Sequence, residues 1–216
     1  MKEQIPLKLA VLISNKGTGT NLGAIIDAIE RGEINCQIGL VVSDRPDALG
    51  LERAKKHQLP WEVRRLKSYR DLNQRDEYGR ALAERLNQEQ IRVAVLAGFM
   101  TVLSHPYFET FQGKTLNIHP GLIPDEKDKP WHFPDGTEAP WNRGLMTETA
   151  VANFLGGRYA GSTIHIATEE TDFGPVLERV LEDVRPDDTV ETLYGRLKLR
   201  EHEGLIRSLA RLSENR

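Results

Sequence analysis

The sequence predicts an α/β fold with a doubly wound, mostly parallel sheet, in a single domain formed by residues 1–216. Three observations favour it. Short apolar runs typical of buried strands alternate with segments of helical periodicity, glycine-rich stretches lie where strands should pass into helices, and no internal repeat or heptad run interrupts the pattern. A chain of 216 residues is also long enough to bury a substantial core.

Each predicted element follows from its residue pattern. Short runs rich in Val, Ile and Leu predict strands at residues 7–13, 37–43, 61–63, 91–97, 115–119, 162–167 and 176–184. Apolar residues at helical spacing predict helices at residues 48–57, 68–88 and 147–155, a first helix beginning near Thr20, and a last one after Thr189. Residues 106–113 are interpreted as a connection. Asp44, after the second strand, is interpreted as a turn or capping residue rather than the ribose-binding acid of a nicotinamide site.

Residues 125–144 show neither helical nor strand periodicity and are rich in proline and tryptophan. A long segment of this kind predicts a functional loop, which we interpret as an active-site flap. Trp131, His132 and Trp141 could close over a substrate, or they could fix the loop to the surface. No spacing of His, Cys or carboxylate residues around His132 resembles a metal site, so no metal is predicted.

The composition excludes several classes of partner. A net charge of −3 leaves no basic surplus, so binding to nucleic acid or to an anionic membrane is not predicted. No apolar run is long enough to span a membrane or to act as an export signal. Cys36 is the only cysteine, which suits a reducing cytoplasm, and it is interpreted as a buried apolar residue. Small-molecule substrates are expected, with a monomer or homodimer both possible.

Asn117 and His119 lie two residues apart in a predicted strand, so their side chains share one face. Pro120 and Gly121 end that strand, which places the pair at its carboxyl end, where open α/β sheets bind ligands. An amide can stabilise an oxyanion and an imidazole can transfer a proton, so the pair indicates acyl-type transfer. The competing interpretation is that both residues are structural, since Asn and His are common near strand ends.

Asp172 strengthens the catalytic interpretation. It follows the predicted strand at residues 162–167, on a loop that leaves the end of a neighbouring strand. A carboxylate there can orient His119 and favour its protonated, proton-donating form. We therefore expect an amide, an imidazole and a carboxylate to converge.

Two further segments are candidate binding sites. The first is the glycine-rich turn Gly17-Thr18-Gly19-Thr20-Asn21, whose free amides could bind a phosphate beside Lys16. It is neither a Walker loop nor the full dinucleotide fingerprint, so the alternative is a tight turn that only connects strand and helix. The second is the apolar segment 98–103, which could hold a flat heterocycle or could be ordinary core.

Four blocks of sequence together resemble the folate-dependent formyltransferases, in the order and spacing of that family. They are Leu12-Ile13-Ser14 with Gly17-Thr18-Gly19-Thr20-Asn21-Leu22, Val95-Leu96-Ala97-Gly98-Phe99-Met100, Leu116-Asn117-Ile118-His119-Pro120-Gly121-Leu122-Ile123-Pro124, and Gly161-Ser162-Thr163-Ile164-His165 with Asp172-Phe173-Gly174-Pro175-Val176. The resemblance extends from residue 7 to residue 209 and is broken by residues 125–144.

The resemblance implies a Rossmann-like formyltransferase fold. It further implies that 10-formyltetrahydrofolate is the formyl donor, that the amine of glycinamide ribonucleotide is the acceptor in purine biosynthesis, and that Asn117, His119 and Asp172 are catalytic. The residues it assigns to folate are Arg75, Met100, Thr101, Val102, Leu103, Asn117, Thr168, Glu169, Glu170, Thr171 and Asp172. Those assigned to the acceptor are Gly19, Thr20 and Asn21 for its phosphate, and Lys198, Leu199, Arg200 and Glu201 for the remainder.

Three departures from the family pattern leave alternatives open. The turn after Ser14 is two residues longer, Thr101 stands where the family usually has arginine, and residues 125–144 replace a short loop on the acceptor side. One alternative is a formyltransferase that acts on methionyl-tRNA or on a sugar nucleotide amine. Another is a nucleotide-binding module without catalysis, which would leave the expected convergence unexplained. A nicotinamide dehydrogenase is disfavoured because Leu22 occupies the third glycine position.

Overall fold

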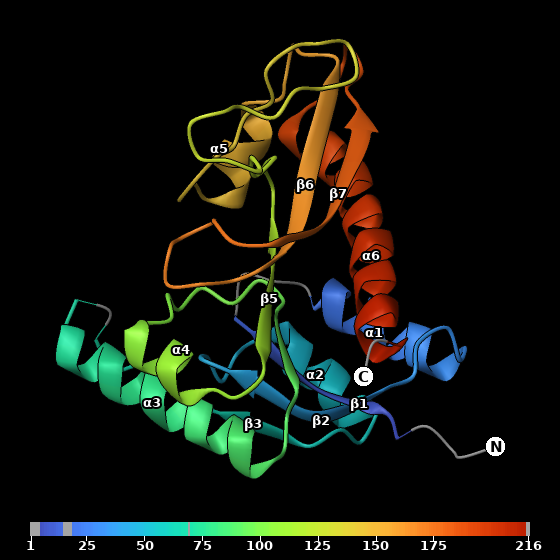
Figure 1. Ribbon diagram of the computed structural model, residues 1–216. Coiled ribbons are helices and arrows are strands. Elements are labelled where there is room, and N and C mark those ends of the chain that lie inside the picture. The colour runs from blue at the N-terminus through green and yellow to red at the C-terminus, as the bar shows by residue number, and fades with distance from the viewer. Residues whose placement is uncertain (1–4, 15–18, 69, 215–216) are drawn as a thin grey trace. The chain divides into compact units, whose positions relative to one another are not determined.

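The computed structural model describes residues 5–14, 19–68 and 70–214 (Figure 1). Strands and helices alternate along most of these residues, and the strands form one seven-stranded sheet with the order β3-β2-β1-β4-β5-β6-β7. The chain divides into two compact units, one formed by residues 1–116 with 209–216 and the other by residues 117–208. Strand β5 (Lys114–His119) begins in the first unit and ends in the second. The expected single domain therefore stays a prediction.

The first unit contains four parallel strands. They are β1 (Leu7–Ile13), β2 (Cys36–Ser43), β3 (Trp61–Val63) and β4 (Val93–Leu96). Its helices are α1 (Thr20–Glu30), α2 (Leu49–Lys56), α3 (Leu72–Gln88) and α4 (His105–Thr110). β1 pairs in parallel with both β2 and β4, and its apolar side chains are buried almost throughout, as expected of a central strand covered on both faces.

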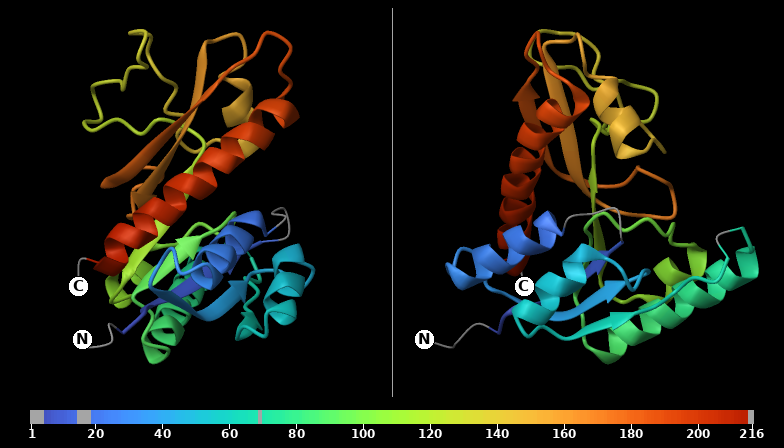
Figure 2. Two further views of the ribbon diagram at one scale, coloured as in Figure 1. Left: turned by 90° about the vertical axis from the view of Figure 1, so that its right-hand side faces the viewer. Right: turned by 180° about the vertical axis from the view of Figure 1, so that it is seen from behind.

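Helices cover both faces of this parallel sheet, which makes it doubly wound (Figure 2). On one face, Leu82 and Leu86 of α3 and Tyr107 of α4 form a buried cluster with Ala10 and Leu12 of β1. Figure 2 shows α1 and α2 on the other face. The predicted fold class, a doubly wound and mostly parallel sheet, is confirmed.

The second unit contains an antiparallel pair of strands and two helices. These are β6 (Tyr159–Ile166), β7 (Val176–Asp183), α5 (Thr147–Ala152) and α6 (Val190–Glu214). The last residues of α6, from Leu209 on, belong to the first unit. β6 and β7 pair along almost their whole length. Gly204 of α6 lies against Ile164 and Val180, so a Cβ at this position would come within 2.8 Å of both side chains. The absence of that atom lets α6 run close along the pair.

The observed elements differ from the predicted ones at two places in the first unit. Residues 106–113 are expected to form a connection, but residues 105–110 form the short helix α4, which has Pro106 in its first turn and is stabilised by burial of Tyr107. Helix α3 begins at Leu72 instead of residue 68, because the Asp71 side chain caps it by accepting a hydrogen bond from the Gln74 amide at 3.2 Å.

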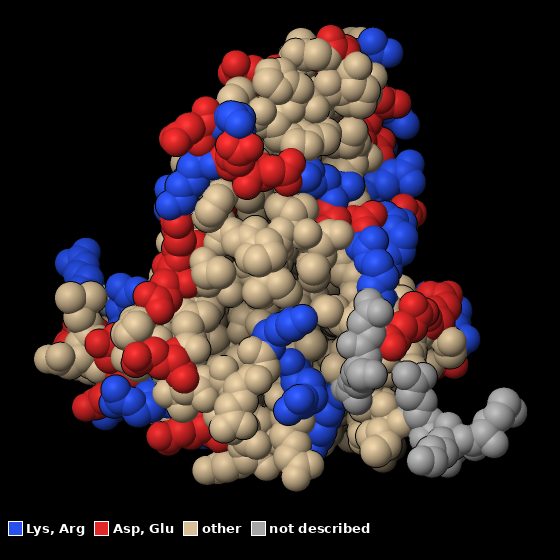
Figure 3. Space-filling view, in the orientation of Figure 1, with Lys and Arg blue, Asp and Glu red and all other residues tan. Residues whose placement is uncertain are grey.

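The surface and interior agree with the composition. Acidic and basic side chains are interspersed on the surface that Figure 3 shows. Cys36 is buried, as predicted. Within the described residues, every helix is too short or too polar to cross a membrane.

Candidate active site

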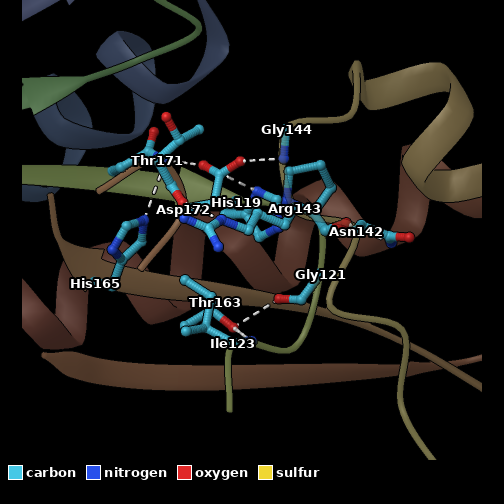
Figure 4. Close-up of polar contacts among 12 residues, drawn as sticks. His119, Gly121, Ile123, Asn142, Arg143, Gly144, Thr163, His165, Thr171 and Asp172 are labelled. Atoms are coloured by element: carbon cyan, nitrogen blue, oxygen red, sulfur yellow. Dashed lines mark hydrogen bonds and ion pairs between the residues drawn. The ribbon is translucent and has the colours of Figure 1, made fainter. Parts of the chain in front are cut away.

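The three side chains predicted to be catalytic meet in the second unit, at the carboxyl end of β5. Figure 4 shows His119 and Asp172 side by side. The Nδ1 atom of His119 lies 3.4 Å from Oδ1 of Asp172. The amide nitrogen of Asn117 donates to the same carboxylate oxygen, also at 3.4 Å. The predicted convergence of amide, imidazole and carboxylate is therefore observed within one unit.

The backbone of His119 is fixed where β5 ends. Its carbonyl oxygen accepts hydrogen bonds from the Gly121 amide at 2.8 Å and from the Ser162 hydroxyl at 2.7 Å. The side chain is 3% exposed, so its ring nitrogens depend on protein partners. A buried imidazole on a fixed backbone has a single defined orientation.

Both ring nitrogens of His119 face oxygen acceptors. Nε2 lies 2.6 Å from the carbonyl oxygen of Trp141, which can only accept, so Nε2 carries a proton. Nδ1 faces the Asp172 carboxylate. The doubly protonated imidazolium satisfies both contacts, and it is the form that can act as an acid.

Asp172 is held in an unusual backbone conformation. Its φ angle is 48°, in the left-handed region that residues other than glycine rarely adopt. The Gly144 amide donates to its Oδ2 at 2.8 Å (Figure 4), and the Trp141 indole donates to its backbone oxygen at 2.8 Å. Oδ1 is thereby left directed at Asn117 and His119, and such strain is commonly found at functional sites.

Residues 125–144 are bound to the loop that carries Asp172. Arg143 donates to the Thr171 carbonyl at 3.0 Å and pairs with Glu170 at 2.8 Å, and Lys127 pairs with Glu170 at 2.6 Å. The segment therefore reaches His119 through the Trp141 carbonyl and Asp172 through the Gly144 amide. Sequence reasoning missed these two contacts, because any residue can supply a backbone group and no pattern marks it. Movement of the segment as a flap stays a prediction.

Gly121 allows the Trp141 carbonyl to reach His119. A Cβ at residue 121 would lie 2.1 Å from the Trp141 oxygen and 2.6 Å from Nε2 of His119. We expect Gly121→Ala to separate the Trp141 oxygen from the His119 ring. The free energy of unfolding should fall by about 1–3 kcal/mol, because a buried hydrogen bond is left unmade. The kcat should fall as well. Thermal unfolding and steady-state turnover measure both effects.

Gly195 provides the matched control for this substitution. It lies inside α6, and an added Cβ would have no heavy atom within 4 Å. Gly195→Ala should therefore stabilise the protein by about 0.5–1 kcal/mol. Equal behaviour of the two variants would show that the contact between Trp141 and His119 is unimportant.

The glycine-rich turn lies in the first unit, where α1 begins at Thr20 as expected. Gly19 has a φ of 68°, and a Cβ there would lie 2.8 Å from Cα of Gly50, so both conformation and space require glycine. Thr20 and Asn21 form the first turn of the helix. Residues 15–18, which include Lys16 and Gly17, lie outside the described residues.

The segment 98–103, also in the first unit, is tied to the ends of β1 and β2. The Ser14 hydroxyl donates to Oδ1 of Asp44 at 2.6 Å and accepts from the Met100 amide at 2.9 Å. The Thr101 hydroxyl donates to Oδ2 of Asp44 at 2.9 Å. The interpretation of Asp44 as a turn or cap is thus incomplete, because this buried carboxylate joins three segments. Leu103 belongs to the core, whereas the apolar side chain of Val102 is 57% exposed.

The other predicted binding residues are distributed between the two units. Arg75 lies on α3 in the first unit, where its carbonyl accepts from the Ser104 hydroxyl at 3.3 Å. Residues 168–172 form the Asp172 loop of the second unit, closed by a hydrogen bond from the Thr168 hydroxyl to the Phe173 carbonyl at 2.8 Å. Residues 198–201 lie on α6 in the same unit.

Glu201 differs from its neighbours on α6. Leu199 is 61% exposed and Arg200 pairs with Glu182 at the surface, but the Glu201 carboxyl is buried and contacts the Ser162 hydroxyl at 2.8 Å. Burial raises the pKa of Glu201 to about 7, against the opposing effects of Ser162 and Lys198. A buried acid with a displaced pKa is typical of functional sites.

Comparisons with known proteins identify the family of this chain. The formyl transferase family model matches residues 7–209. Phosphoribosylglycinamide formyltransferase of Haemophilus influenzae is 34% identical over 91% of this chain and 82% of its own length. The trifunctional purine biosynthetic protein adenosine-3 of Gallus gallus is 36% identical over 94% of this chain, which spans only 18% of that longer protein.

Solved structures show the same relationship. Glycinamide ribonucleotide transformylase 1 from Symbiobacterium toebii superposes with a TM-score of 0.81 at 32% identity, covering 99% of this chain and 91% of its own. Phosphoribosylglycinamide formyltransferase from Bacillus halodurans superposes with a TM-score of 0.78 at 28% identity, covering 96% of each chain. On the family match and the 34% identity to the Haemophilus influenzae enzyme, this chain belongs to the formyl transferase family.

Proposed function

We propose that this protein transfers a formyl group from 10-formyltetrahydrofolate to the amine of glycinamide ribonucleotide, a step of purine biosynthesis. The observation that carries the proposal is the meeting of Asn117, His119 and Asp172, with the carboxylate 3.4 Å from both partners. The named activities of the Haemophilus influenzae and Symbiobacterium toebii proteins support the choice of acceptor.

The three side chains divide the chemistry between them. The acceptor amine forms a bond to the formyl carbon, and the oxyanion that develops is stabilised by the Asn117 amide and the His119 imidazolium. The bond from the formyl carbon to the folate nitrogen then breaks, that nitrogen gains a proton, and the former amine loses one. Asp172 holds His119 in its proton-donating form and accepts hydrogen bonds throughout.

The remaining residues would bind the two substrates. The amides at Gly19, Thr20 and Asn21 suit the ribonucleotide phosphate, because free N–H groups and the positive end of the α1 dipole attract an anion. Residues 198–201 would contact the rest of the acceptor, with Glu201 the main contact. Residues 100–103 and 168–172, together with Arg75, would hold the folate. No metal is required, and we place the enzyme in the cytoplasm as a monomer or homodimer.

Spectroscopic measurement of tetrahydrofolate release tests the proposal. The purified protein is supplied with 10-formyltetrahydrofolate and, in separate reactions, with glycinamide ribonucleotide, methionyl-tRNA or a sugar nucleotide amine. We expect turnover with glycinamide ribonucleotide and none with the other two amines. Turnover with another amine would overturn the assigned acceptor, and nucleotide binding without turnover of any amine would favour the non-catalytic module.

A further inference from the structure

His165 lies beside the proposed catalytic side chains. Among the described hydrogen bonds, its ring contacts Asn117 but neither His119 nor Asp172. It belongs to β6 and is 1% exposed. Its Nε2 atom lies 3.2 Å from the amide nitrogen of Asn117, and its Nδ1 atom lies 3.2 Å from the carbonyl oxygen of Ile166 (Figure 4 shows the ring). Both ring nitrogens therefore have partners.

These partners select one form of the imidazole. The amide nitrogen of Asn117 can only donate, so Nε2 of His165 must accept and carries no proton. The Ile166 carbonyl can only accept, so Nδ1 carries the proton. Burial keeps the ring neutral by lowering the pKa of His165 to about 4, an effect that the positive charge of His119 increases and the Asp172 carboxylate opposes.

The contact with Asp172 is separate evidence for which way the Asn117 amide faces. Its Oδ1 atom accepts from the same amide nitrogen at 3.4 Å, so a rotated amide would bring its own oxygen toward a carboxylate. One amide hydrogen thus points at His165 and the other at Asp172. The contact to Asp172 is at the long limit of a hydrogen bond, which makes that hydrogen the one available to an incoming oxyanion.

We propose that His165 is a positioning residue for Asn117: its neutral ring accepts one amide hydrogen and thereby directs the other toward the reacting formyl oxygen. This inference rests on the role proposed for Asn117 in formyl transfer. It assigns His165 a task in the reaction, although its side chain need not touch either substrate. An Nε2-protonated ring at the same place would favour the opposite direction of the amide.

The test compares a variant that removes the acceptor with one that keeps an acceptor oxygen. His165→Leu should lower kcat by about tenfold to a hundredfold, less than the hundredfold or more expected for loss of an oxyanion donor, with little change in KM. His165→Gln can present its side-chain oxygen to Asn117 and should recover most of the lost kcat. Ile164→Val, a conservative change at the next buried position of β6, controls for loss of packing.

A double-mutant cycle separates positioning from a general structural effect. If His165 acts through Asn117, His165→Leu should lower kcat little further in an Asn117→Ala background, because coupled residues are not additive. Multiplication of the two losses would overturn the inference. Unchanged turnover of Asn117→Ala alone would instead contradict the proposed function, so the two failures are distinguishable.

Nitrogen NMR of the unmodified protein provides a readout that does not depend on any variant folding. The ring of His165 should show a protonated Nδ1 and an unprotonated Nε2 at neutral pH. A protonated Nε2, in the other tautomer or in an imidazolium, would remove the acceptor and overturn the inference.

Discussion

Substitution of asparagine for Asp172 is expected to lower kcat by about a hundredfold to ten-thousandfold, the range associated with loss of a general acid or base. The replacement has nearly the same shape. Its side-chain oxygen can still accept from the Gly144 amide, which now donates to Oδ2 at 2.8 Å. Its amide nitrogen would then face Nδ1 of His119 and the amide of Asn117, and all three groups are donors. The variant loses the acceptor that favours the His119 imidazolium while the loop keeps its anchor.

The measurement is steady-state formyl transfer together with thermal unfolding. Glu178→Gln is the matched control, because it removes a carboxylate from the same unit, on β7, where Glu178 pairs with Arg207 at 3.1 Å. We expect the control to keep a kcat close to that of the unchanged protein. A folded Asp172→Asn variant with the turnover of the control would show that the carboxylate has no part in the reaction.

The sequence was sufficient to predict that Asn117, His119 and Asp172 converge, because local rules place these side chains. Alternation along β5 puts Asn117 and His119 on one face, and Pro120 and Gly121 end the strand at the edge where ligands bind. Asp172 could be added because it follows a second strand end. Their meeting in three dimensions depends on which strands are neighbours, and the connection rules of α/β folds restrict that choice strongly.

The contacts that hold these side chains could not be predicted in the same way. Trp141 and Gly144 act through a backbone carbonyl and a backbone amide, and they lie in a segment without periodicity. The neutral ring proposed for His165 depends on its burial on β6 and on its contact with Asn117 of β5, a strand distant in sequence. Helix α4 was missed for a related reason, since tertiary packing of Tyr107 stabilises a helix too short to be favoured by its own residues.

Glu201→Gln is expected to stabilise the protein at alkaline pH while leaving its stability near pH 4 almost unchanged. Burial raises the pKa of the Glu201 carboxyl from 4.5 to about 7, so the folded state binds more protons than the unfolded state between these values. Stability from this group is complete below about pH 4.5 and is lost as the pH rises through 7. Because one pKa unit corresponds to about 1.4 kcal/mol, the loss is on the order of 3 kcal/mol by pH 8 or above.

Glutamine removes this dependence because it stays neutral at every pH, and its side-chain oxygen can still accept from the Ser162 hydroxyl, which donates to the present carboxyl at 2.8 Å. Denaturant unfolding of both proteins from pH 4 to pH 9 measures the difference in their free energies of unfolding. If the two free energies change with pH in parallel, the pKa of Glu201 is not raised.

The loss of stability at neutral pH also bears on function. A carboxyl that destabilises the protein at neutral pH can be retained where binding or catalysis needs it. We therefore expect the stabilised Glu201→Gln variant to show a raised KM for glycinamide ribonucleotide.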